Sequence, residues 1–144
     1  MGKKRIASKS GGEMDQGLRA KSLARAAKKK IELGVLHIVS TYNNTQVLLT
    51  DAKGNAICSS SSGALGFSGA KKGTPFAAAK VGELIGEKAN TIGLKEVDVV
   101  IRGVGAGRES ALRAFAGKGI GVLSIKDKTP VPHNGPKPPK PRRI

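Results

Sequence analysis

The chain has 144 residues and carries 26 Lys and Arg against 10 Asp and Glu, a formal net charge of +16 at pH 7. This length supports one domain with a hydrophobic core plus tails. No apolar segment approaches a membrane span, and the single Cys58 excludes both an intrachain disulfide and a zinc site built from cysteines.

The N-terminal segment is a basic arm. Residues 1–30 carry ten basic and two acidic side chains. Such unevenly placed charge is typical of arms that bind polyanions. Leu18, Leu23, Ala27 and Ile31 mark one weak helical face, and the alternative is disorder that folds only on a partner. We expect residues 1–30 to be largely disordered, or ordered by RNA, and residues 31–129 to form the globular core.

The core begins with an antiparallel meander. Branched apolar residues predict strands over residues 35–40, 46–51 and 56–60. The paired Asn43 and Asn44 tolerate positive φ and predict a tight hairpin turn between the first two strands. Asp51 opens the second turn, over residues 52–55.

The pattern then changes to alternating helices and strands. A Ser/Gly-rich loop runs over residues 59–73, and Thr74-Pro75 predicts a helix start, with Gly93 at the stop. A buried strand over residues 97–102, a glycine loop over 103–107, a helix over 108–115 and a strand over 122–126 follow. The two helices act as crossovers, which favours parallel pairing. We therefore predict an α/β fold, βββαβαβ, with a mixed five-stranded sheet and helices packed on its faces.

The C-terminal segment, residues 130–144, is an extended basic tail. It holds six of the seven prolines, four basic residues and no acid. Proline lacks the amide donor and fixes φ, so a helix or a central strand is excluded. A stiff, extended, cationic strand fits a groove lined with phosphates.

Two loops have competing interpretations. Gly103, Gly105 and Gly107 precede Arg108, but the dinucleotide-binding pattern requires Gly at that last position, so we expect no cofactor. The glycines serve a tight strand-to-helix turn, and this is compatible with polyanion contact. In the loop over residues 59–74, Lys71 and Lys72 point to anion binding at a helix start, and a flexible solvated loop is an equal alternative.

Catalysis is not expected. Asp51, Asp98 and Asp127 lie near strand ends, which raises a metal-dependent nuclease as one rival, but their spacing indicates no cluster. A histone-like DNA-coating protein is the other rival, because such a protein needs only a high net positive charge to bind DNA. The chain has only four aromatic residues, which favours phosphate and shape contacts over base stacking.

Several strings together resemble the bacterial and organellar small-subunit ribosomal protein eleven family. They are YNNT at residues 42–45, GFSG at 66–69, KGTPFAA at 72–78, GRESA at 107–111 and DKTPVPHNG at 127–135. The resemblance spans about residues 34–144 and departs from the family where Val104 and Ala106 replace usual prolines, Pro136 a usual Cys and Pro141 a usual basic residue.

The resemblance implies a ribonuclease-H-like fold without catalysis, cofactor, metal or small-molecule substrate. It implies binding to small-subunit rRNA in the platform near the mRNA exit path, beside ribosomal proteins seven, eighteen and twenty-one. It also implies a cytoplasmic ribosome in a bacterium, or else an organellar one, and no membrane. The expected RNA-binding residues are Asn43, Asn44, Ser62, Ser68, Gly69, Lys71, Lys72, Thr74, Gly105, Gly107, Arg108, Arg113, His133, Asn134, Lys137, Lys140, Arg142 and Arg143.

Overall fold

A computed structural model describes residues 30–143, so the expected arm lies outside the described residues except for its last position. The element order confirms βββαβαβ. The elements are β1 (Leu33–Ser40), β2 (Thr45–Asp51), β3 (Ala56–Ser61), the short 3-10 helices η1 (Gly63–Leu65) and η2 (Gly69–Gly73), α2 (Pro75–Ile92), β4 (Glu96–Arg102), α3 (Gly107–Ala116) and β5 (Gly121–Asp127).

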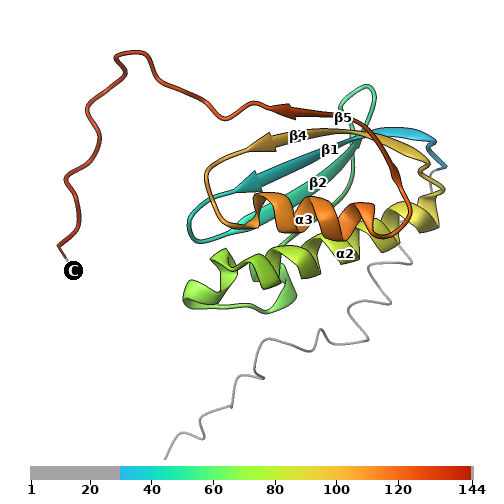
Figure 1. Ribbon diagram of the computed structural model, residues 1–144, viewed down its shortest axis with the longest axis horizontal. Helices are drawn as coiled ribbons and strands as arrows, with labels where there is room; N and C mark the ends of the chain where they lie inside the picture. The colour runs from blue at the N-terminus through green and yellow to red at the C-terminus, as the bar shows by residue number, and fades with distance from the viewer. Residues whose placement is uncertain (1–29, 144) are drawn as a thin grey trace, which may run out of the picture.

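The strands form one mixed sheet in the order β3-β2-β1-β4-β5. The meander pairs antiparallel, β1 with β2 and β2 with β3. After the crossover through α2, β4 returns parallel to β1, and after α3, β5 returns parallel to β4 (Figure 1). The prediction of parallel pairing for the later strands is therefore confirmed.

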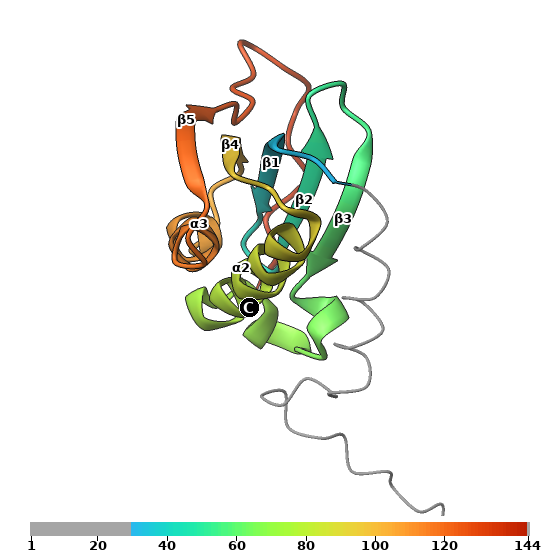
Figure 2. The same ribbon diagram turned by 90° about the vertical axis from the view of Figure 1, so that its right-hand side faces the viewer.

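Both helices pack on the same face of the sheet (Figure 2), whereas the sequence had suggested helices on more than one face. The β3–α2–β4 and β4–α3–β5 connections join parallel strands and run in the same direction across the sheet, so right-handed crossovers place both helices on one face. The two helices also contact each other closely. A Cβ added at Gly82 of α2 would lie 2.3 Å from the carbonyl oxygen of Ala111 in α3, and one at Gly86 would lie 2.6 Å from the side chain of Lys118, just after α3. These small residues let α3 lie directly against α2, so that the pair covers one face.

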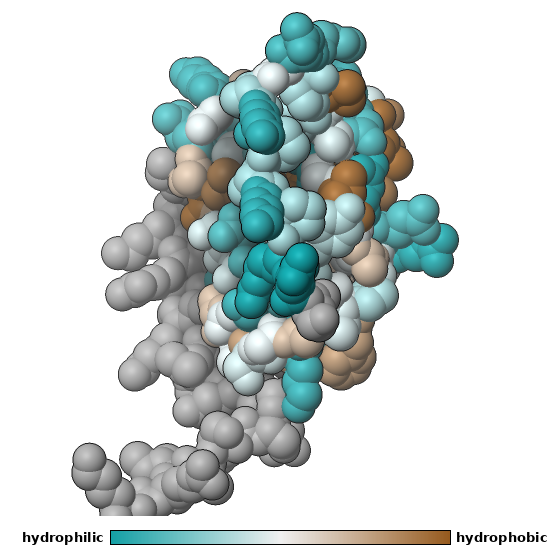
Figure 3. All heavy atoms as spheres, turned by 90° about the vertical axis from the view of Figure 1, so that its left-hand side faces the viewer, coloured by the Kyte–Doolittle hydropathy of each residue, from teal (hydrophilic) through white to brown (hydrophobic). Residues whose placement is uncertain are grey.

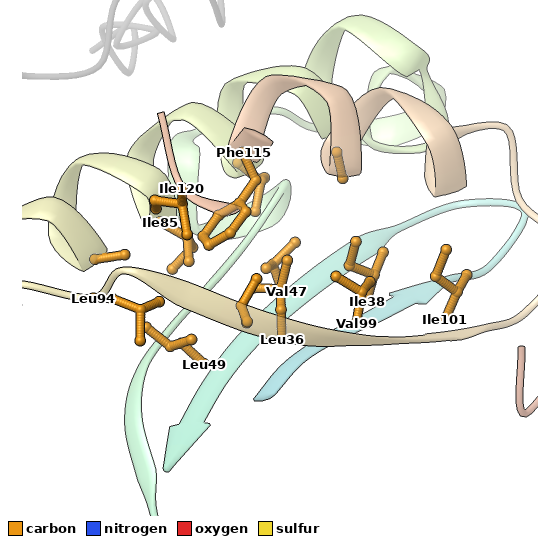
Figure 4. Packing of buried hydrophobic residues seen from close by; sticks show 14 of the residues in the cluster. Leu36, Ile38, Val47, Leu49, Ile85, Leu94, Val99, Ile101, Phe115 and Ile120 are labelled. Atoms are coloured by element: carbon orange, nitrogen blue, oxygen red, sulfur yellow. The ribbon is translucent and has the colours of Figure 1, made fainter. Parts of the chain in front are cut away.

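The hydrophobic core lies between that face and the two helices (Figure 4). Leu36 and Ile38 of β1 alternate with half-buried residues such as His37, and both are fully buried. The Phe115 ring from α3 is also fully buried against them. The period-two alternation in the strand thus selects the covered face of the sheet.

Local signals in the sequence fix several element ends. The Thr74 hydroxyl accepts a hydrogen bond from the Ala77 amide at 3.3 Å and caps α2, with Pro75 in the first turn. Gly93 ends the helix with φ of 87°. Both predicted helix signals are confirmed.

The β1–β2 turn is present, but the reason given for it was wrong. Among the described residues that are not glycine, only Asn134 has positive φ, so Asn43 and Asn44 are not left-handed. The turn is closed instead by Thr41, whose amide donates to the Asn44 carbonyl oxygen at 2.8 Å and whose hydroxyl accepts from the Asn44 amide at 3.1 Å.

Residues 130–143 form no helix or strand, and every one of them is exposed. The segment leaves the end of β5 and runs away from the sheet (Figure 1). Within residues 30–143, no helix has both the length and the apolar character needed to cross a membrane.

Candidate nucleic-acid interface

One end of the sheet gathers the loops that the sequence singled out. The parallel strands β1, β4 and β5 all finish there, so the β1–β2 turn, the β4–α3 loop and the start of the tail lie at the same end (Figure 1). Both helices also begin there. Backbone amides at helix N-termini favour negative charge, and here two such termini face one side of the molecule.

Glycines let these loops pack backbone on backbone. An added Cβ would lie 2.1 Å from the Ser40 carbonyl oxygen at Gly103, and 2.2 Å from the Thr41 carbonyl oxygen at Gly105. The Gly105 amide donates to the Ser40 carbonyl oxygen at 2.9 Å. Gly103 also has φ of +96°. The glycines therefore serve the turn, as one interpretation held, and they also seat the loop against the end of β1.

A glycine packed against backbone also holds the loop before α2, residues 62–74, in place. A Cβ at Gly73 would lie 2.3 Å from the Tyr42 carbonyl oxygen, so η2 packs directly on the β1–β2 turn. The sequence left a flexible loop and an anion-binding loop equally open here. The two short 3-10 helices and this contact give residues 62–74 defined structure.

Arg108 connects the glycine loop to the base of the tail. Its guanidinium donates to the Gly103 carbonyl oxygen, to the Thr129 hydroxyl at 3.3 Å and to the Asp127 carboxylate. The Thr129 amide in turn donates to Asp127 at 2.9 Å. Hydrogen bonds from Thr129 and then Arg108 hold the pKa of the Asp127 carboxyl well below its usual range. We call Gly103, Arg108, Asp127 and Thr129 the tail brace.

The tail brace was missed by sequence reasoning, which considered Asp127 only as a carboxylate near a strand end. The pairing joins residues 19 positions apart, and it depends on β4 and β5 ending together. A local signal existed in the Asp-x-Thr spacing, which is typical of a turn closed by an Asp side chain. The Arg108 side chain is 29% exposed, so part of it lies at the surface beside the brace.

The structure places the predicted binding residues in different surroundings. Asn43, Gly105 and Arg108 lie at the loop end. Gly73 packs on the turn that holds Asn43, so Lys71, Lys72 and Thr74 lie near that turn. The Ser62 hydroxyl is buried and donates to the Thr45 carbonyl oxygen at 3.5 Å, and the Thr74 hydroxyl is used as the cap of α2. The other members lie apart or deeper. Asn44 and Gly107 are partly or fully buried in the loop end, Ser68 and Gly69 begin η2, Arg113 pairs with Glu109 on α3, and His133, Asn134, Lys137, Lys140, Arg142 and Arg143 are exposed along the tail.

The three acidic residues considered for metal binding do not meet. The Asp51 carboxylate closes the β2–β3 turn by accepting from the Lys53 and Asn55 amides, at the end of the sheet opposite Asp127. Asp98 accepts from the Ser124 hydroxyl at 2.5 Å. Within the described part of the chain, no group of three or more His, Cys, Asp or Glu residues is arranged to hold a metal ion.

The surface at the loop end is predominantly hydrophilic (Figure 3). Basic side chains outnumber acidic ones in the loops and the tail, since residues 130–143 add four cations and no carboxylate. Backbone amides, helix termini and cations therefore face the same side. This arrangement suits an extended polyanion rather than a small ligand.

The model of the family described as ribosomal protein S11 matches residues 34–143. The matched range runs from the first residues of β1 through the tail, so it includes every loop at the end just described.

Proposed function

The chain belongs to the ribosomal protein S11 family, and from that premise we propose that it binds small-subunit rRNA in the platform near the mRNA exit path and supports subunit assembly and translation. Membership makes it an RNA-binding, structural component of the small ribosomal subunit and not an enzyme. The proposal goes beyond family membership in assigning the protein to the platform.

One observation carries the proposal, namely the convergence of two glycine-seated loops, two helix N-termini and the braced start of a cationic tail at one end of the sheet. Each feature alone is common in proteins. Together they place a packed face with two helix N-termini beside an exposed line of cations, which matches folded RNA with its exposed backbone and crevices.

In this mechanism, the core and the tail bind different parts of the RNA. The loops around Gly105, with Lys71 and Lys72, would bind the RNA backbone by shape and charge. Lys137, Lys140, Arg142 and Arg143 would neutralise phosphates in crevices that a rigid domain cannot enter. Arg108 contributes by fixing where the tail starts, and its unused N–H groups remain available to a phosphate.

In the assembled subunit, this protein would lie beside ribosomal proteins seven, eighteen and twenty-one, with mRNA nearby. We propose a ribosome in the bacterial cytoplasm, with an organellar ribosome as the second location. The remaining RNA-binding residues proposed from the sequence are Asn43, Asn44, Ser62, Ser68, Gly69, Thr74, Gly107, Arg113, His133 and Asn134, some at the loop end and others apart from it. Of these, Ser62 and Thr74 would act through backbone placement, because their hydroxyls are already bonded internally.

The test is a titration of the protein with small-subunit rRNA over a range of salt concentrations. Six phosphate contacts predict a slope of log K against log salt of roughly −4 to −5. Duplex DNA at equal salt is the comparison that separates this proposal from a DNA-coating protein. A slope near zero, or equal affinity for duplex DNA, would contradict the proposal.

A further inference from the structure

Two of the four aromatic side chains point outward at the loop end. Phe115 is fully buried and Phe67 is 8% exposed, as core residues should be. In contrast, Tyr42 is 85% exposed in the β1–β2 turn, and Phe76 is 57% exposed in the first turn of α2. Neither ring is needed to complete the hydrophobic core, so their exposure calls for a different explanation.

The two exposed rings stand on parts of the backbone that touch. Gly73 packs on the Tyr42 carbonyl group, and Phe76 follows only three residues later, after the Thr74 cap. Thr41 fixes the turn that carries Tyr42 through two hydrogen bonds to Asn44. Both residues therefore extend from backbone segments that contact each other and are held by hydrogen bonds, which lowers the entropic cost of binding a planar ligand.

Phe76 is also held in orientation. Its ring centroid lies 6.0 Å from that of Phe67, with the two planes at 84°, an edge-to-face contact. The Lys80 ammonium lies 5.6 Å from the Phe76 centroid, and it also pairs with Glu83 at 3.1 Å. A nearly buried ring thus supports an exposed one, with a cation close by.

We propose that Tyr42 and Phe76 form a stacking site for an unpaired nucleobase of the RNA. Aromatic faces bind unstacked bases, and cations beside them bind the flanking phosphates. Lys71 and Lys72 supply that charge from η2, and within residues 30–143 neither has a carboxylate partner. The inference rests on the proposed RNA binding and adds base stacking to an interface expected to use phosphate contacts alone.

The chain offers a direct optical readout, because Tyr42 is its only tyrosine and it has no tryptophan. Tyrosine fluorescence of the unmodified protein therefore reports on this one ring. Addition of small-subunit rRNA should quench it, after correction for RNA absorbance with free tyrosine amide in the same solution. Emission that stays unchanged at saturating RNA would overturn the assignment.

Variants separate stacking from charge. Tyr42→Leu and Phe76→Leu should each weaken binding by about 5- to 150-fold, the range for loss of one stacked base. Tyr42→Phe keeps the ring and should bind as the unmodified protein does. Because stacking releases no counterions, the salt slope should be the same in all three variants. Leu33→Ser is the matched control, since Leu33 is 53% exposed at the other end of β1.

The outcomes also separate this inference from the proposed function. A steep salt slope with full affinity in both Leu variants would refute the stacking site and leave RNA binding intact. A slope near zero would refute RNA binding itself. If both Leu variants bind rRNA normally but fail to enter subunits, the rings contact a neighbouring protein, and the nucleobase assignment is wrong.

Discussion

Replacing Gly105 with Ala tests whether the glycine loop must lie against the end of β1. The added Cβ would lie 2.2 Å from the Thr41 carbonyl oxygen and 2.4 Å from the Ser40 hydroxyl, whereas ordinary contact begins at 3.4 Å. One of the two obstacles is backbone, so a rotamer change cannot relieve the clash. The loop has to move away from β1, and the hydrogen bond from the Gly105 amide to the Ser40 carbonyl oxygen is stretched or lost.

The size of the effect follows from these two losses. Overpacking in a closely packed site costs about 1–3 kcal/mol, and a lost hydrogen bond costs about 0.5–1.5 kcal/mol. We therefore expect Gly105→Ala to lower the free energy of unfolding by about 1.5–4.5 kcal/mol. Urea denaturation followed by far-ultraviolet circular dichroism measures this, since the chain has no tryptophan to report unfolding.

Gly63→Ala is the matched control. Its added Cβ would meet only the Lys72 side chain, at 3.8 Å, and Gly63 does not have positive φ. We expect its unfolding free energy to stay within about 0.5 kcal/mol of the unmodified value. If Gly105→Ala were as stable as Gly63→Ala, the glycine loop would not pack against the end of β1 as described.

Three further predictions concern the cap of α2, the half-buried thiol of Cys58 and the tail brace. Thr74→Ala removes the cap at the Ala77 amide and should lower the free energy of unfolding by about 0.5–2 kcal/mol in the same urea assay, whereas Thr91→Ala at the exposed end of α2 should have a smaller effect. Burial raises the pKa of the Cys58 thiol to about 11 from 9.0, with Lys88 opposing the shift, so iodoacetamide at pH 9 should modify the folded protein far more slowly than the protein in urea; equal rates would contradict the burial. Because the raised pKa favours the neutral thiol in the folded state, its contribution to stability is fully present below pH 9 and is lost as pH rises toward 11. Arg108→Gln should speed hydrogen exchange at the Gly103 amide, which donates to Thr129, while exchange in α2 stays unchanged; retained protection at Gly103 would show that the brace does not depend on Arg108.

The order of elements could be predicted because each rests on a local pattern. Period-two alternation around Leu36 and Ile38 marks a strand with one covered face, and Thr74-Pro75 marks a helix start whatever surrounds it. Parallel pairing of β4 with β1 then follows from the intervening helix. These steps need no knowledge of distant contacts.

Features that depend on three-dimensional contacts were harder to reach. The helices pack closely because Gly82 and Gly86 leave room for α3 and the residues after it, and no periodicity in either helix encodes that contact. The Asn43-Asn44 turn was predicted correctly but for the wrong reason, because the Thr41 side chain closes it without positive φ. The turn propensity of asparagine predicts that a turn is present, but it does not predict which hydrogen bonds close it.

The candidate site shows the same division. Composition placed the cations in loops and tail, and the parallel topology brings those loops to one end. The bond between Arg108 and Asp127 could not be foreseen, since its partners meet only once β4 and β5 end side by side. The outward position of Tyr42 and Phe76 was hidden as well, because a count of aromatics says nothing about which of them face solvent.

The most direct test of the account is incorporation into small ribosomal subunits, measured by co-sedimentation with the intact chain and with a chain ending at Thr129. The truncation keeps the whole tail brace and removes the cations at Lys137, Lys140, Arg142 and Arg143. Losing four phosphate contacts should shift half-release to lower salt and make the slope of log K against log salt shallower by about 3 units. Equal retention of both chains across the salt range would contradict the claim that the tail binds among RNA phosphates.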